Sequence, residues 1–165
     1  MIDAELRELY QEVILDHGRS PRNCRRPDHI TCQAQGNNPM CGDRLTVYLD
    51  LDDDGTIREA TFEGRGCAIS MASASMMTEV LKGKTKPQAE ALFRSFQALC
   101  TKDAPGDRAE TEETADEEAL ERLQVLAGVR DFPVRVKCAT LPWHTMHAAV
   151  LGRGGQGGDE VTTEL

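Results

Sequence analysis

The chain has 165 residues, 39% of them hydrophobic and only 4% aromatic, which predicts a single domain with a core of aliphatic side chains. Its formal net charge of −9 argues against nucleic-acid binding, because contacts with phosphates need a basic face. The first residues are acidic where a secretion signal needs basic ones, and no apolar run reaches the ~20 residues of a membrane span, so we expect a cytoplasmic protein with no membrane partner.

The first half of the chain predicts one helix followed by three strands. Residues 3–17 carry apolar side chains at helical spacing. Strands are predicted over 29–35, 44–52 and 57–62, and in the second of them apolar and polar residues alternate, which indicates that one face is buried. The short connections predict that these strands pair as an antiparallel meander.

The second half of the chain predicts only helices. They cover residues 68–82, 87–100, 117–126 and 138–150. Between them, residues 102–116 are polar and acidic, so we expect a solvated loop there.

This order of elements indicates an α+β fold, in which a small antiparallel three-stranded sheet is packed by helices on one face. We expect residues 1–151 to form this single domain. Residues 152–165 are rich in glycine and polar residues and are expected to form a flexible C-terminal tail.

Three of the six cysteines have surroundings that favour the thiolate, the form that binds metals and attacks sulfur. Cys41 lies in a predicted turn, with Asp43 two residues further along; the alternative is an ordinary exposed loop cysteine. Cys67 opens a predicted helix, whose dipole lowers the pKa of a thiol, and the alternative is a small buried residue. Cys138 follows two cations, and the alternative is a core cysteine at the start of a helix.

Together with Asp43, these cysteines supply four anionic ligands, the number that a tetrahedral zinc site needs. The spacing alone does not establish such a site, because zinc ribbons contain paired C-x-x-C units and this chain has none. His144 and His147, at positions i and i+3 of a predicted helix, are a second candidate metal pair. Partly packed or surface histidines are the plainer interpretation.

Arg135 and Lys137 are expected to support a site at Cys138. Four anionic ligands around a divalent ion leave a net negative charge, which nearby cations offset. For Lys137 the alternative is a solvent-facing lysine with no such role.

Six segments carry motifs that occur together in one known group of proteins. They are residues 9–17 (LYQEVILDH), 20–23 (SPRN), 36–43 (GNNPMCGD), 62–70 (FEGRGCAIS), 72–78 (ASASMMT) and 132–139 (FPVRVKCA). In this order they resemble the IscU/NifU superfamily of iron–sulfur scaffold proteins. Lys137 stands where IscU-type scaffolds have a histidine, and the stretch between Cys67 and Cys138 is longer than theirs. Both features resemble the SufU branch, whose members are zinc-dependent sulfur-transfer proteins.

The resemblance implies a function and a set of site residues. Proteins of the SufU branch bind one zinc ion through three cysteines and an aspartate, which correspond to Cys41, Cys67, Cys138 and Asp43. Cys41 corresponds to the sulfur acceptor, and the implied partner is a SufS-type cysteine desulfurase that carries a persulfide. In that branch a histidine of the desulfurase takes one zinc coordination place and releases the acceptor cysteine. The chain is thus interpreted as a sulfurtransferase for iron–sulfur cluster biogenesis, with other iron–sulfur assembly proteins as further candidate partners.

Two alternatives stay open at this point. A non-catalytic scaffold would assemble a labile iron–sulfur cluster on the same ligands, and Lys137 in place of histidine argues against it. A purely structural zinc domain would unfold on chelation and would not stimulate a desulfurase. The chaperone-binding Leu-Pro-Pro-Val-Lys motif of IscU has no counterpart here, which argues against an Hsp70-type partner.

Overall fold

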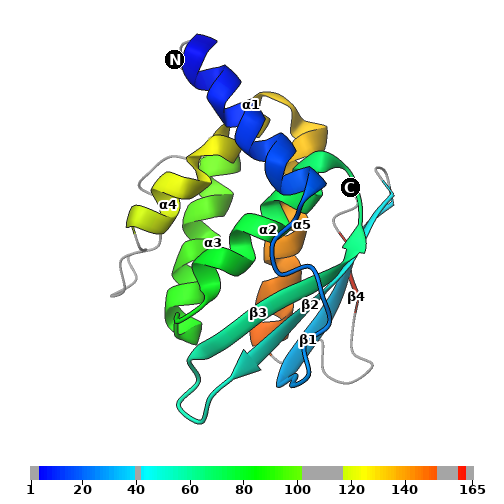
Figure 1. The fold of residues 1–165 in the computed structure, drawn as a ribbon, viewed down its shortest axis with the longest axis vertical. Helices are drawn as coiled ribbons and strands as arrows, with labels where there is room; N and C mark the ends of the chain where they lie inside the picture. Colours follow the sequence, from blue (N-terminus) through cyan, green and yellow to red (C-terminus); the bar gives the residue numbers. More distant parts are fainter. Residues whose placement is uncertain (1–3, 40–41, 102–116, 152–159, 163–165) are drawn as a thin grey trace.

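A computed structural model describes residues 4–39, 42–101, 117–151 and 160–162 of the chain. Its elements are, in chain order, α1 (Ala4–Arg19), β1 (Cys32–Asn38), β2 (Asp43–Leu51), β3 (Ile57–Arg65), α2 (Ala68–Leu81), α3 (Lys86–Thr101), α4 (Glu117–Leu123), the 3₁₀ helix η2 (Gln124–Asp131), α5 (Pro133–Val150) and β4 (Glu160–Thr162). The helices cover one face of the sheet, and the segment between α1 and β1 crosses the other, outer face (Figure 1). The predicted α+β arrangement is confirmed.

The strands β1, β2 and β3 pair in antiparallel order, as the meander predicts. The alternation in β2 is also confirmed, because Leu45, Val47 and Leu49 are buried. The intervening Arg44 and Thr46 therefore lie on the outer face of the sheet. Since Asp43 shares the face of Leu45, it belongs to the helix-covered side.

The strand β1 begins and ends three residues later than the predicted 29–35, at Cys32–Asn38. Its sequence is mostly polar and lacks the alternation that identifies β2, so pairing with β2 determines its extent. Gly36 allows α5 to pack directly on this strand, because a Cβ atom there would overlap the side-chain oxygen of Thr145.

Strand β4 pairs parallel with β1 and was not predicted. It falls within residues 152–165, which the sequence indicated as a flexible tail. Three residues are too few to carry a periodic pattern, so only the pairing with β1 reveals this strand. The remaining tail residues lie outside the described part of the chain, and for them the tail stays a prediction.

Helix α5 begins at Pro133, not at the predicted residue 138. Proline is favourable at the first position of a helix, where its missing N–H costs no intrahelical hydrogen bond. Cys138 is therefore within the helix and not at its start. Further along, Pro142 lies in the helix interior and has no N–H to donate to the carbonyl of Cys138, four residues earlier.

The core lies between the helices and the covered face of the sheet. Phe96 of α3 and Trp143 of α5 are fully buried and stack with their ring centroids 4.8 Å apart. Such aromatic pairs add about 0.5–1.5 kcal/mol beyond the burial of their surface. Within the described residues, no helix combines the length and the apolar character needed to cross a bilayer.

Candidate metal centre

Three side chains with metal-binding atoms converge where β2 begins and α2 starts. They are Asp43 at the first position of β2, Cys67 immediately before α2, and Cys138 within α5. Their ligand atoms all lie within 4.8 Å of one another, and this is the one such group of three or more found in the described residues. The structure thus brings together three of the four predicted ligand residues. The fourth, Cys41, lies outside the described residues.

A direct hydrogen bond joins two of these residues. The backbone N–H of Cys67 donates to Oδ1 of Asp43 at 2.8 Å, and the Cys67 sulfur lies 4.0 Å from Oδ2. Gly66 makes room for this approach, because a Cβ atom there would lie 2.5 Å from Oδ1 of Asp43. The preceding Gly64 has a φ of +149°, a conformation that side chains disfavour, so the two glycines have different roles.

Cys67 caps the N-terminus of α2, as the sequence predicts. Its sulfur accepts a hydrogen bond from the backbone N–H of Ser70 at 3.4 Å. Hydrogen bonding from the Cys138 thiol lowers the pKa of Cys67 to about 6, against the opposing effects of burial and of the Asp43 charge. The predicted thiolate is therefore favoured at neutral pH, mainly because of a second thiol, while the backbone of the first helical turn contributes less.

Cys138 is fully buried. Asn38 at the end of β1 points its amide nitrogen at the Cys138 sulfur, 3.8 Å away, and that sulfur is also 3.8 Å from the carbonyl oxygen of Val134. Asn38 is itself completely buried, so it belongs to the walls of the site. Asn38 lies in one of the sequence motifs, but the motif gives no sign of this contact.

This donor set fits a zinc ion. Zinc bonds of about 2.3 Å to sulfur place two tetrahedral ligands roughly 3.8 Å apart, so the observed spread needs only a small contraction. Two thiols and a carboxylate supply the anionic oxygen and sulfur ligands that zinc accepts. Asp43 and Cys138 are buried, whereas Cys67 is partly exposed.

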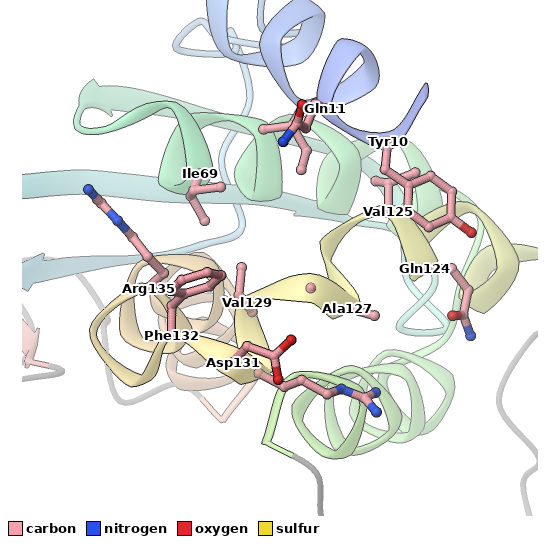
Figure 2. A pocket seen from close by; sticks show the side chains of 13 residues that line it. Tyr10, Gln11, Ile69, Gln124, Val125, Ala127, Val129, Asp131, Phe132 and Arg135 are labelled. Carbon is pink, nitrogen blue, oxygen red and sulfur yellow. The ribbon is translucent and has the colours of Figure 1, made fainter. Parts of the chain in front are cut away.

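A largely apolar pocket of about 900 Å³ lies beside the centre but does not include it. Helix α1, the start of α2, η2 and the start of α5 form its walls (Figure 2). Ile69, Phe132 and Arg135 lie at one end of it, and Tyr10 lies at the other. Ile69 is two residues beyond Cys67, so this end of the pocket lies near the start of α2.

The two predicted supporting cations lie on α5 on the side of Cys138 nearer the helix start. Arg135 is exposed and lines the apolar pocket, whereas Lys137 is partly exposed. Their role at the centre stays a prediction.

The candidate histidine pair takes no part in a metal group among the described residues. His144 and His147 pack against the ring of Phe93, at centroid distances of 5.1 and 4.8 Å. The Nε2 atom of His147 also lies 3.3 Å from the carboxylate of Glu90. These contacts agree with the plainer interpretation, in which both residues are partly packed histidines.

Three further cysteines lie apart from the centre, and burial raises the pKa of each. Cys24 is exposed in the segment after α1, Cys32 starts β1 and is partly buried, and Cys100 is fully buried in the last turn of α3. The pKa of Cys100 rises to about 12. Cys67 therefore contrasts with them, since its pKa is lowered.

Comparison with known proteins gives a consistent result. The sequence profile of one family, described as the NifU-like N terminal domain, matches residues 9–139. The zinc-dependent sulfurtransferase SufU of Bacillus subtilis (strain 168) is 39% identical over 153 residues, which cover 93% of this chain and 97% of that protein. The iron–sulfur cluster assembly scaffold protein IscU of Streptococcus pyogenes serotype M1 is 35% identical, over 89% of this chain and 86% of the relative. A crystal structure from Fervidobacterium islandicum AW-1, described as a putative iron–sulfur cluster assembly scaffold protein for the SUF system, superposes with a TM-score of 0.72 and 32% identity, over 87% of this chain and 97% of that one.

Proposed function

Because the chain belongs to the NifU-like N-terminal domain family, we propose that it accepts persulfide sulfur from a cysteine desulfurase during iron–sulfur cluster assembly, with a bound zinc ion. The family assignment agrees with the superfamily that the motifs predicted. The name of the Bacillus relative supports zinc-dependent sulfur transfer, and the names of the other two support a place in cluster assembly. We propose that the partner is a desulfurase of the SufS type and that the protein acts in the cytoplasm.

The observation that carries this proposal is the convergence of Asp43, Cys67 and Cys138. These residues come from three separate elements, and the lowered pKa of Cys67 suits a thiolate ligand. Cys41, two residues before Asp43, is proposed as the fourth ligand and as the acceptor.

The bound zinc would hold the cysteine ligands as thiolates without adding redox chemistry. The thiolate of Cys41 attacks the outer sulfur of the desulfurase persulfide. A new sulfur–sulfur bond forms on Cys41 as the old one breaks, and the desulfurase cysteine leaves as a thiolate, so no oxidant or reductant is needed. Asp43, Cys67 and Cys138 would continue to hold the zinc while Cys41 is released, and the carboxylate of Asp43, a harder ligand than thiolate, would make the site easier to open.

A scaffold for a labile iron–sulfur cluster is the second candidate, since two of the relatives are named as scaffold proteins. Its ligands would be the same residues. The metal content of freshly purified protein separates the two: about one zinc per chain and no colour supports sulfur transfer. Brown protein with iron and acid-labile sulfide supports the scaffold.

The direct test is the turnover of the SufS-type desulfurase with and without this protein. We expect the zinc-loaded protein to increase turnover and to carry a persulfide on Cys41, detected by mass spectrometry. The variant Cys41→Ala should bind zinc more weakly and accept no sulfur. If the wild-type protein neither stimulates the desulfurase nor gains sulfur, the proposal is wrong.

A further inference from the structure

Two arginines lie side by side on the outer face of the sheet, at the end of the sheet where the metal centre lies. Arg44 of β2 and Arg65 of β3 are register partners, and both are exposed. Arg44 follows Asp43 directly and Arg65 precedes Cys67 by two residues, so their backbones lie within about 7 Å of ligand residues. Like charges at directly opposed positions destabilise an antiparallel strand pair, so strand pairing does not account for them.

Other arginines on the same molecule have acidic partners. The ion pairs are Arg22 with Asp16, Arg25 with Glu59, Arg58 with Asp50 and Arg122 with Glu79. Within the described part of the chain, Arg44 and Arg65 form no ion pair, although acidic residues outnumber basic ones by 28 to 19. The nearby carboxylate of Glu63 accepts a hydrogen bond from the Tyr48 hydroxyl at 2.6 Å, which holds it toward the middle of the sheet.

The arginine pair borders a shallow hollow of about 360 Å³ on the outer face of the sheet. The rest of it is lined by Leu45, Thr46, Tyr48, Glu63 and Gly64. A guanidinium group binds a carboxylate through two parallel hydrogen bonds, so the two arginines can receive one or two acidic side chains.

We propose that Arg44 and Arg65 dock acidic side chains of the cysteine desulfurase and so position it over the metal centre. The inference rests on the proposed function. Cys67 is partly exposed, and its two sequence neighbours, Gly66 and Ala68, are small and exposed. A protein that covers the thiols at this end of the sheet therefore also contacts the two long, positively charged side chains on its outer face. Because the whole chain carries a charge of −9, this pair also supplies a local attraction for an acidic surface that the rest of the molecule repels.

The test is the concentration of this protein that half-saturates the SufS-type desulfurase, measured at low salt with zinc-loaded variants. For the double variant Arg44→Gln with Arg65→Gln, we expect that concentration to rise about tenfold, because charges at the edge of an interface act on association. The maximal rate and the zinc content should stay unchanged. At about 0.5 M salt, where charges are screened within a few ångströms, the difference from wild type should largely vanish. The matched control is Arg58→Gln with Arg94→Gln, which removes the same charge elsewhere and should behave as wild type.

A second variant separates docking from a structural role. Arg65→Glu places an acid opposite Arg44, so the like-charge pair becomes an ion pair. We expect this variant to melt at a slightly higher temperature yet to dock more weakly. Equal half-saturation for wild type and the Arg44, Arg65 double variant would overturn the inference and leave the proposed function intact. A wild-type protein that stimulates no desulfurase would instead overturn both.

Discussion

The backbone N–H of Cys67 donates to the carboxylate of Asp43 at 2.8 Å, across 24 positions of sequence. This bond ties the start of α2 to the start of β2 and presents one carboxylate oxygen to the thiols. Asp43 is only 1% exposed, so its carboxylate depends on this partner for part of its hydrogen bonding.

The first prediction concerns Asp43→Ala. Removing the acceptor leaves the Cys67 N–H without its partner, which should lower the free energy of unfolding by about 1–3 kcal/mol in urea titrations. Losing a ligand that makes the site easier to open should also slow single-turnover sulfur transfer by about tenfold. Asp43→Asn is the control, because its amide oxygen still accepts the hydrogen bond but is a weaker ligand. It should retain stability and still transfer slowly, and transfer as fast as wild type by either variant would contradict the role given to Asp43.

The second prediction concerns the space beside that carboxylate. Gly66→Ala would put a Cβ atom 2.5 Å from Oδ1 of Asp43, so the carboxylate must move. We expect weaker zinc binding in competition with a chromogenic chelator, and a loss of about 1–3 kcal/mol in stability. Gly128→Ala is the matched control, since a Cβ there meets nothing within 4 Å. Equal zinc affinity for wild type and Gly66→Ala would show that the close approach does not matter.

The third prediction concerns the charge next to Cys138. Lys137→Glu should weaken zinc retention during dialysis, because it adds an anion beside an already anionic ligand set. Lys137→Arg keeps the charge and should retain zinc as well as wild type does. Unchanged zinc content in the glutamate variant would remove Lys137 from the supporting residues.

The fourth prediction concerns the buried His17, whose Nδ1 atom lies 2.7 Å from the Ser75 hydroxyl. Burial, with a smaller effect of Arg22, lowers the pKa of His17 below its ordinary 6.5. The unfolded chain then binds this proton more tightly than the folded one. The contribution of neutral His17 to the free energy of unfolding is therefore fully present above pH 6.5. It is lost as the pH falls below that value.

Urea titrations between about pH 5 and 8 should show this loss for the wild type and a flatter profile for His17→Gln. His144 is a partly buried histidine whose pKa is also lowered by burial, so His144→Gln should flatten the profile in the same direction. Parallel pH profiles for wild type and His17→Gln would contradict the assignment.

The fifth prediction compares two cysteines outside the centre. Cys100 is completely buried and its pKa is about 12, so iodoacetamide at mildly alkaline pH should leave it unmodified in the folded protein. Cys24 is exposed and should react under the same conditions. Peptide mapping before and after denaturation measures both, and rapid modification of Cys100 in the native state would mean that α3 opens readily.

The pattern of side chains predicted the regular part of this fold well. Strand β2 was identified within one residue at each end, because its apolar alternation reports directly on burial. The start of α5 was missed, since Arg135 and Lys137 interrupt the apolar pattern of its first turns. The boundaries of β1 depend on its pairing with β2, and its polar sequence carries little trace of that pairing.

The candidate site was predictable as a set of residues but not as an arrangement. The motifs named Asp43, Cys67 and Cys138, yet residues so far apart in sequence can be shown to meet only in three dimensions. The motif Gly-Arg-Gly-Cys also contained Gly66, whose function of making room for a carboxylate depends on a chain segment 23 residues away. In the same way, the opposition of Arg44 and Arg65 follows from strand register, which sequence periodicity does not determine.

Both borders of the sheet are occupied by short pieces of the same chain. Strand β4 pairs along β1, and on the opposite border the carbonyl of Asn23 accepts a hydrogen bond from the N–H of Phe62. An unpaired edge strand can pair with the edge strand of another copy of the protein, which leads to aggregation. A chain shortened to end at residue 151 would lose β4, and residues 35–37 of β1 would then be available to recruit a second molecule. Residues 160–162 thus protect this edge of the sheet against self-association, on the far side from β3.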